Sequence, residues 1–452
     1  MVSISGIRGI VGTSLTPEIV VKYASAFAEY CGRKPIVIGR DGRVTGKSIG
    51  HIVSSTLLQM GCDVAALGVC PTPTIQLAIE KLHASGGISI TASHNPIEWN
   101  GLKFMSSTGL FLDAEENKRF WGIADRPARA YQPWDKQGKH RAIPEFVDNH
   151  IKLILQLPHL DVARIRERGF KVAVDCINGS GGVIVPKLLR ELGCSVVEMN
   201  CDVSGIFAHT PEPLPENLTD LSRLVQKERA DLGIAVDPDA DRLVLIDERG
   251  IPIGEEYTIA NVTKFVLQRE TGLKKPGRLT TVVNLSTTRA VDDIAKEFGA
   301  TVLRTAVGEI NVAKKMQETG AVIGGEGSGG VILPNLHLGR DALVGIALTL
   351  QHLAEFEGTL SQLKQSLPEY HIAKGKVDVG TLDPDKALER IKIKLTKNGE
   401  ATTIDGLKID FADSWVHLRK SNTEPIIRVI AEARSKQKAE ELVKTFTQEL
   451  LA

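Results

Sequence analysis

Three aspartates in the segment "DLGIAVDPDADRLVLID" have the spacing of a cation site. Asp237, Asp239 and Asp241 stand two residues apart between two strand-like apolar runs. If the segment is extended, every second side chain projects to the same side, so the three carboxylates would point together. Carboxylates held together repel one another unless a cation lies between them, and Mg²⁺ commonly takes few carboxylates and keeps positions for water or phosphate oxygen. The spacing therefore predicts one Mg²⁺ per chain.

The same segment has two other interpretations. Asp237, Asp239, Asp241 and Glu248 match positions 1, 3, 5 and 12 of a calcium-binding EF-hand loop. Arg242 stands where that loop requires glycine, and the flanks are strand-like rather than helical, which argues against an EF-hand. An acidic turn between the two strands of a hairpin remains as the plain structural alternative.

The polar run "TASHNPIEWNGLK" follows the strand-like "GGISI" and brings Ser93, His94 and Lys103 onto what we expect to be an irregular loop. A serine hydroxyl is a weak nucleophile until a base removes its proton or a cation polarises its partner, and His94, Lys103 and a metal site can do both. A phosphate oxygen on Ser93 would also fill an open position on the metal. A helix cap at the serine and an ordinary turn at "HNP" are the alternatives.

A glycine-rich segment, "IGGEGSGGVI", places Glu326 and Ser328 on a nearly bare backbone after a strand-like run. It lacks the lysine that a phosphate-binding P-loop carries after its last glycine. A carboxylate acceptor beside a hydroxyl suits the adjacent hydroxyls of a sugar, although glycines can also mark simple flexibility.

A second donor-rich segment, "HLRKSNTEPIIRV", lies near the C-terminus between two strand-like runs. Arginine can bind phosphate oxygens through two parallel hydrogen bonds, and hydroxyl and amide donors commonly surround the same anion. The segment is therefore a candidate phosphate site, with a polar hairpin loop as the alternative. Its candidate residues are Arg419, Ser421, Asn422, Thr423 and Arg428.

One structural unit recurs three times and must position these loops. A β-branched run, a polar turn, a helical pattern and a second β-branched run follow one another from "PIVIGRDGR", from "KVAVDCINGSGG" and from "LTTVVNLSTT". A glycine ends each helical pattern and a valine follows three residues later, which suits a left-handed helix terminus before a buried strand. These positions are Gly61, Gly193 and Gly299, followed by Val64, Val196 and Val302.

The recurrence predicts three related mixed α/β domains with mostly parallel sheets, whose functional loops lie at the carboxyl ends of strands. The tail instead alternates strands between two helices, which predicts a smaller C-terminal α+β domain. Changes in composition place the domains at residues 1–150, 151–254, 255–369 and 370–452. In this order the domains carry the serine loop, the aspartates, the glycine-rich segment and the donor-rich segment.

Composition narrows the class of protein. Lys and Arg together number 55, equal to Asp and Glu at 55, so the chain lacks the positive field expected of a nucleic-acid or anionic-membrane partner. No apolar run approaches the ~20 residues of a membrane span, and the N-terminus does not resemble a signal peptide, so we expect a cytoplasmic protein. The six cysteines form no CxxC pair and are expected to be reduced core residues.

The motifs "TASHNP" with "NGLK", "DPDADR", "GEGSGG" and "RKSNTEP" occur in this order, one set per expected domain. Together they resemble the α-D-phosphohexomutase family of phosphoglucomutases, phosphomannomutases and phosphoglucosamine mutases over essentially the whole chain. The resemblance implies that Ser93 is a phosphoserine, that the three aspartates hold Mg²⁺, and that Glu326 and Ser328 contact the sugar. It also implies that residues 419–428 hold the phosphate that does not react.

Two further arginines join the expected site. "SGIRG" supplies Arg8, which matches an arginine that family members carry near the catalytic serine. Arg242, directly after the aspartates, is assigned to the substrate.

The sequence departs from the family pattern in two places. Many relatives have histidine where Gly330 stands, so Lys103 and His94 become the candidates for proton transfer. The usual "GDG" is replaced by "GRDAL", residues 339–343.

The activity implied is that of an isomerase, an intramolecular phosphotransferase that interconverts hexose 6-phosphate and hexose 1-phosphate through a phosphoserine and a bisphosphate. A phosphosugar substrate, Mg²⁺ and a hexose 1,6-bisphosphate activator are expected, in a monomer or homodimer. Glucosamine phosphate is the expected substrate. A phosphomannomutase or phosphoglucomutase, a non-catalytic sugar-phosphate-binding regulator and a metal-dependent phosphatase are the alternatives.

Overall fold

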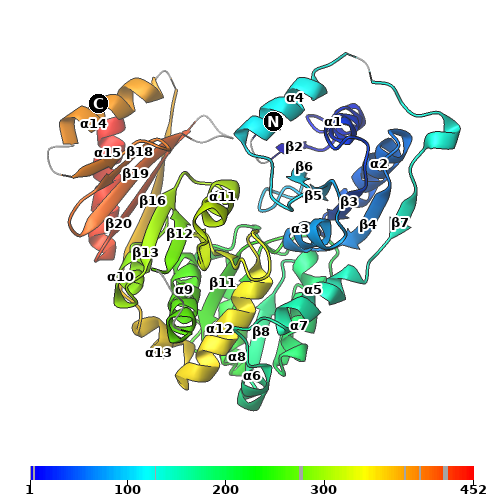
Figure 1. The fold of residues 1–452 in the computed structure, drawn as a ribbon. Helices are drawn as coiled ribbons and strands as arrows, with labels where there is room; N and C mark the ends of the chain where they lie inside the picture. The colour runs from blue at the N-terminus through cyan, green and yellow to red at the C-terminus, as the bar shows by residue number, and fades with distance from the viewer. Residues whose placement is uncertain are drawn as a thin grey trace.

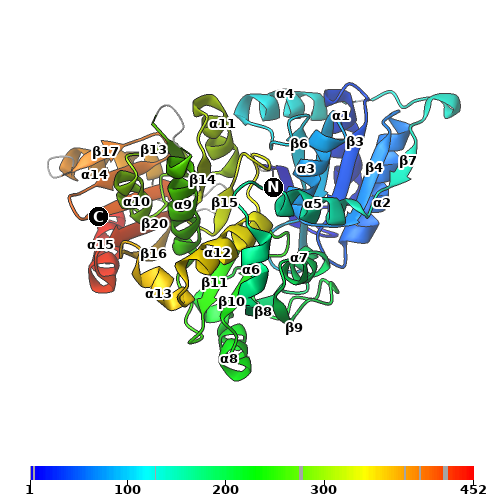
Figure 2. The same cartoon turned by 60° about the horizontal axis from the view of Figure 1, so that its bottom comes forward.

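The structure, a computed structural model, describes residues 2–3, 6–127, 129–273, 278–380, 383–395, 399–420 and 426–451. Four units, each built on its own sheet, follow one another along the chain. Figures 1 and 2 show the N-terminal unit in blue at one end, the C-terminal unit in orange and red at the other, and the two middle units between them.

The N-terminal unit has a seven-stranded sheet of order β1-β2-β6-β5-β3-β4-β7, parallel between β5 and β7 and antiparallel from β1 to β5. Its strands are β1 (Val2–Ser3), β2 (Gly6–Ile10), β3 (Ile36–Arg40), β4 (Val64–Val69), β5 (Gly86–Ile90), β6 (Trp99–Ser106) and β7 (His140–Ala142). Its helices are α1 (Pro17–Tyr30), α2 (Gly46–Gln59), α3 (Thr72–Lys81) and α4 (Ala114–Ala124).

The second and third units each have a four-stranded sheet with two parallel pairs and one antiparallel hairpin. The second unit comprises α5 (Phe146–Leu155), α6 (Val162–Arg168), β8 (Lys171–Asp175), α7 (Val185–Glu191), β9 (Ser195–Met199), α8 (Thr219–Glu228), β10 (Leu232–Val236) and β11 (Leu243–Asp247). The third comprises α9 (Glu255–Gly272), β12 (Thr280–Asn284), α10 (Ala290–Glu297), β13 (Thr301–Thr305), α11 (Glu309–Thr319), β14 (Ile323–Glu326), β15 (Gly330–Ile332), α12 (Ala342–Phe356) and α13 (Leu360–Gln365).

The C-terminal unit has a wholly antiparallel five-stranded sheet of order β16-β20-β19-β18-β17. Its elements are β16 (His371–Asp378), α14 (Pro384–Leu395), β17 (Glu400–Thr402), β18 (Leu407–Asp410), β19 (Ser414–Lys420), β20 (Ile426–Ala433) and α15 (Lys436–Leu451). The predicted fold class, three mixed α/β units and a smaller α+β unit, is confirmed.

The predicted repeat is present in three parallel strand pairs, β3/β4, β8/β9 and β12/β13, each joined by a helix. Gly61, Gly193 and Gly299 follow these helices with φ of +89°, +80° and +65°. This left-handed conformation costs glycine no steric strain, so each helix can end there and the chain can return into the sheet.

Helix α12 joins the middle of the molecule. Every residue from Ala342 to Ala354 is buried, and the helix packs against α9, α6 and β15 (Figure 1). Asp341 caps it by accepting a hydrogen bond of 2.9 Å from the Leu343 amide. A helix that is apolar on all sides is typical of a buried core position.

The cysteines have the environment expected from the sequence. All six cysteines are free; five are buried and Cys201 is half-buried, which confirms the expected reduced core residues. Within the described part of the chain, no helix has both the length and the apolarity that crossing a bilayer requires.

Candidate active site

The three aspartates lie in the turn between β10 and β11 and are almost completely buried, with exposures of 0% to 1%. Ligand oxygens of all three lie within 4.8 Å of one another. The expected extended segment is wrong: Asp237 Oδ1 accepts hydrogen bonds from the amides of Asp241 (3.1 Å) and Arg242 (3.2 Å), and Ala240 has φ +51°. The segment is therefore a turn between two hairpin strands, as the structural alternative proposed, but its three carboxylates are buried in the protein and not exposed at the surface.

These carboxylates fit a hard cation. Asp239 Oδ1 and Asp241 Oδ1 are buried and have no hydrogen-bond partner among the described residues. Burial, and then the charges of Asp241 and Asp239, raise the pKa of Asp237 well above its usual value. A divalent cation would satisfy the unpartnered oxygens and remove this repulsion, and an all-oxygen donor set is the kind that Mg²⁺ prefers.

Ser93 faces the acidic cluster from the loop between β5 and β6. Its Oγ donates to Asp237 Oδ2 at 2.9 Å, and its amide donates to Thr91 Oγ1 at 2.8 Å. Ser93 is 2% exposed and has φ +49°, a conformation that is uncommon outside glycine and is often found at functional sites. The contacts around the serine hold this conformation and direct the hydroxyl toward the aspartates.

Arg43, which the sequence analysis did not single out, holds the serine loop. Its side chain is fully buried, and Nε donates to Asp41 Oδ2 at 3.1 Å. Its two terminal nitrogens donate at 2.5 to 3.0 Å to four loop carbonyls, those of Ser93, Asn95, Pro96 and Trp99. The polar turn "GRDGR" was the only signal of this role in the sequence.

Lys103 lies on β6 opposite Ser89, and not on the loop as expected. It is 3% exposed, and its Nζ donates to Asp239 Oδ2 at 2.6 Å and lies 3.6 Å from Asp241 Oδ2. Burial would raise the pKa of Asp239, but the Lys103 ammonium and hydrogen bonds from Lys103 and Thr72 outweigh burial and hold it below its usual range. Asp239 is therefore ionised.

His94, Arg8 and Arg242 surround the same centre. His94 Nδ1 lies 3.4 Å from Ser93 Oγ. The positive charge of Arg242, followed by burial, holds the pKa of His94 well below its usual value, so the imidazole is neutral. Arg8, on β2, donates from Nη1 to Asn95 Oδ1 at 3.0 Å, and Arg242 Nε lies 3.9 Å from Asp241 Oδ1.

Glu326 ends β14 and is held from three directions. Oε1 accepts from Asn284 Nδ2 at 2.7 Å and from the Gly308 amide at 2.9 Å, and Oε2 accepts from Arg340 Nη1 at 2.7 Å. Burial favours its neutral form, but the Arg340 charge and these hydrogen bonds outweigh burial and lower the pKa, so Glu326 is an ionised acceptor. Ser328 lies half-buried in the turn that follows.

The two described arginines of the expected phosphate site are cross-strand neighbours: Arg419 on β19 faces Arg428 on β20. Lys376 on β16 faces Arg428 in turn, which gives a row of three cations that the sequence did not reveal. Arg419 Nε pairs with Asp405 at 3.0 Å, and Asp405 accepts from the Val307 amide at 2.9 Å. Like charges directly opposite one another are unfavourable, so this row suits an anion.

The other predicted members of that site, Ser421, Asn422 and Thr423, lie outside the described residues. The row of three cations is linked to the rest of the site by a series of contacts. Arg419 pairs with Asp405, Asp405 accepts from the Val307 amide, and the next residue, Gly308, donates its amide to Glu326. The remaining predicted residues converge on one centre from three sheets.

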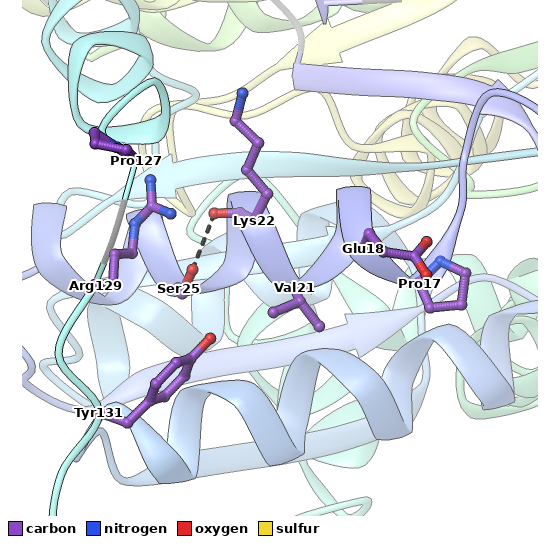
Figure 3. Close-up of a pocket in the computed structure, with 8 residues that line it drawn as sticks. All are labelled: Pro17, Glu18, Val21, Lys22, Ser25, Pro127, Arg129 and Tyr131. Atoms are coloured by element: carbon purple, nitrogen blue, oxygen red, sulfur yellow. Dashed lines mark hydrogen bonds between the residues drawn. The ribbon is translucent and has the colours of Figure 1, made fainter.

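A separate surface hollow of about 560 Å³ lies against α1. Figure 3 shows Lys22 and Val21 on this helix and Arg129 and Tyr131 on the segment after α4. Among the described residues that line it, none belongs to the acidic centre.

Fold and centre together define a class of protein. Three of the four sheet-based units bring a serine hydroxyl, an ammonium and the ionised Glu326 carboxylate around three buried aspartates. This is the architecture of the phosphohexomutases, which are isomerases.

Comparison with known families identifies the particular group. The phosphoglucomutase/phosphomannomutase α/β/α domains I, II and III match residues 2–128, 148–250 and 255–370, and the C-terminal domain matches residues 376–449. The chain belongs to the phosphoglucomutase/phosphomannomutase family, which confirms the resemblance found in the sequence.

Different relatives are named for different substrates. A "Probable phosphoglucosamine mutase" of Methanopyrus kandleri is 36% identical over 97% of this chain and 95% of its own length. A "Phosphoglucomutase/phosphomannomutase" of Thermococcus kodakarensis is 39% identical over 96% of this chain and 95% of its own. A crystal structure of a phosphoglucomutase/phosphomannomutase family protein from Burkholderia thailandensis covers 100% of this chain and 98% of its own, with 26% identity and a TM-score of 0.85.

Proposed function

We propose that the protein interconverts glucosamine 6-phosphate and glucosamine 1-phosphate through a phosphoserine at Ser93. The observation that carries the proposal is the hydrogen bond of 2.9 Å from Ser93 Oγ to Asp237, inside a cluster built for a cation. The name of the Methanopyrus relative supports glucosamine phosphate. The Thermococcus relative supports a second candidate, glucose and mannose phosphates.

The reaction follows from the serine. The phosphoryl group leaves Ser93 Oγ for the free hydroxyl of a hexose monophosphate: the bond from phosphorus to Oγ breaks, a bond to the sugar oxygen forms, and the hydroxyl loses its proton. The resulting 1,6-bisphosphate turns in the site. Its other phosphoryl group then moves to Ser93, which leaves the isomeric monophosphate and regenerates the phosphoserine.

Surrounding groups have separate tasks in this proposal. The Lys103 ammonium, fixed on Asp239, offsets negative charge on the moving phosphoryl group. Neutral His94, whose Nδ1 lies 3.4 Å from Ser93 Oγ, can accept a proton. Asp237, Asp239 and Asp241 would hold Mg²⁺, which when bound would neutralise phosphoryl charge. Glu326 and Ser328 would contact sugar hydroxyls.

The cation row on the C-terminal sheet is assigned to the phosphate that does not react. Replacing Arg428 by alanine should raise KM for glucosamine, glucose and mannose 1-phosphates by a similar factor, about tenfold or more, because phosphate recognition is lost while sugar contacts remain. Steady-state kinetics on the three sugars would measure this. Lys436→Ala, which removes an exposed charge on α15, is the matched control. A loss confined to one sugar would contradict the assignment.

Selectivity at carbon 2 should be limited. The bisphosphate must bind in two orientations related by a half-turn, so the 3- and 4-hydroxyls exchange places near the axis while the carbon-2 substituent moves to another part of the site. No single pocket can hold an amine there in both orientations. We expect kcat/KM for glucosamine, glucose and mannose 1-phosphates to lie within about 10³ of one another.

Inversion at carbon 4 should cost more, because Glu326 and Ser328 are expected to meet that hydroxyl in both orientations. Galactose 1-phosphate, measured beside the three other sugars, is therefore the informative comparison. Galactose accepted as well as glucose would show that these two residues do not hold the sugar. Assay of free phosphate in the same reactions separates a mutase, which conserves phosphate, from a phosphatase.

A further inference from the structure

Arg340 is a charged residue at the centre of the site that has no task of its own in the proposed reaction. It stands two residues before α12, with its side chain 11% exposed. Each of its three nitrogens pairs with a different acid: Nη2 with Asp241 Oδ2 at 2.7 Å, Nη1 with Glu326 Oε2 at 2.7 Å, and Nε with Glu309 Oε2 at 3.1 Å. Three acids from three segments therefore fix one guanidinium.

Gly330, the first residue of β15, makes room for this side chain. A Cβ atom at position 330 would lie 2.3 Å from Arg340 Cδ and 3.1 Å from its Cγ. Gly330 does not have the positive φ that would itself demand glycine. The lack of a side chain at position 330 therefore leaves the space that the Arg340 side chain fills. The two departures from the family pattern, Gly330 and "GRDAL", thus lie next to each other in the fold.

We propose that Arg340, seated over Gly330, is a positioning residue that joins the metal-binding turn to the sugar-binding strand and limits the affinity of the aspartates for their cation. The proposal rests on the proposed function, because it takes Asp241 as a metal ligand and Glu326 as a sugar contact.

The positioning follows from which oxygens Arg340 occupies. It takes Oδ2 of Asp241, and the other oxygen, Oδ1, is the one left buried without a partner. On Glu326 it takes Oε2, while Asn284 and Gly308 take Oε1. Both carboxylates are therefore held in one orientation by the same planar group, and a lysine cannot reproduce this three-way geometry.

The effect on cation affinity follows from charge. The guanidinium lies in direct contact with a ligand carboxylate, so it repels a divalent cation bound to the neighbouring oxygen, and this repulsion is weakly screened in a buried site. Removing Arg340 should therefore strengthen cation binding while it damages catalysis. A purely structural ion pair would lower both together.

The test combines calorimetric Mg²⁺ titration without sugar, steady-state kinetics and thermal unfolding of the full chain. Arg340→Ala should bind Mg²⁺ at least about tenfold more tightly and lose about 10²-fold or more in kcat/KM. Arg340→Lys should keep Mg²⁺ affinity within about threefold of wild type yet lose at least about tenfold in kcat/KM. Gly330→Ala should cost at least about tenfold in kcat/KM in the wild-type background and less than about threefold in the Arg340→Ala background.

Each outcome of these measurements either supports or overturns the inference about Arg340. Unchanged or weaker Mg²⁺ binding by a folded Arg340→Ala, or equal losses from Gly330→Ala in both backgrounds, overturns the inference. If Arg340→Ala does not fold, full activity of Gly330→Ala or of Arg340→Lys overturns it equally. A wild type that turns over sugar phosphate but binds no Mg²⁺ would instead overturn the proposed metal site, and the inference with it.

Discussion

Replacing Ser93 by alanine is expected to lower kcat by at least about 10³-fold, because the phosphoryl transfer is divided into two steps only through this oxygen. Among the described residues, Ser93 is the one whose side chain donates a hydrogen bond to Asp237, at 2.9 Å, and the buried Arg43 fixes the loop backbone. The methyl group of alanine fits the same space, so loss of activity should come without loss of folding.

The matched control is Ser107→Ala, an exposed serine in the turn after β6, which should retain wild-type turnover. Intact-mass and phosphopeptide analysis of the purified protein should find one phosphoryl group on Ser93 in part of the wild type and none in the Ser93→Ala variant. A wild type that carries no phosphate and is fully active without added hexose 1,6-bisphosphate would refute the phosphoserine route.

The architecture could be predicted because it repeats. A glycine after each helix and a valine three residues later mark the same backbone event three times, and the event depends on local conformation and on burial of the next strand. The arrangement of the four units could not be predicted in this way. For the two middle units it depends on α12, which contacts α5, α6 and β11 of the second unit and α9, β15 and α13 of the third, and one apolar helix does not indicate which neighbours it will have.

The loop residues of the candidate site were predicted from residue types and spacing, but their geometry could not be predicted in this way. The extended segment expected for the aspartates is a turn because Asp237 accepts two backbone amides, a preference that spacing does not reveal. Lys103 was expected on a loop because β6 is buried on both faces and so lacks the alternation of a half-exposed strand.

Supporting residues were missed for a different reason. Arg43, Thr72 and Arg340 act on partners distant in the chain: Arg43 on the serine loop, Thr72 on Asp239 at 2.6 Å, and Arg340 on Asp241 at 2.7 Å. Each is an ordinary residue within its own segment. Only the tertiary contacts show that these side chains hold the reactive groups in place.

Removal of divalent cations should abolish turnover, and Asp239→Asn should weaken Mg²⁺ binding by at least about tenfold. Three carboxylates whose ligand oxygens lie within 4.8 Å of one another are unfavourable without positive partners. Lys103 pairs chiefly with Asp239 and Arg340 pairs with Asp241, and among the described residues no ion pair serves Asp237. Burial, together with the charges of Asp241 and Asp239, raises the pKa of Asp237 well above its usual value. Neutralising Asp239 removes one ligand and frees Lys103 at the same time, so both cation binding and phosphoryl charge balance should suffer.

Stability gives a readout that does not depend on turnover, since a ligand that binds only the folded protein raises its unfolding temperature. Adding Mg²⁺ should raise the unfolding temperature of the wild type and of Asp220→Asn, an exposed control on α8, but should raise that of Asp239→Asn much less. Excess chelator should remove both the stabilisation and the activity, and restored Mg²⁺ should return both. Full activity in excess chelator, or equal stabilisation of all three proteins by Mg²⁺, would show that the buried aspartates do not bind a catalytic cation. Their mutual repulsion would then have to be relieved by protonation of Asp237 instead.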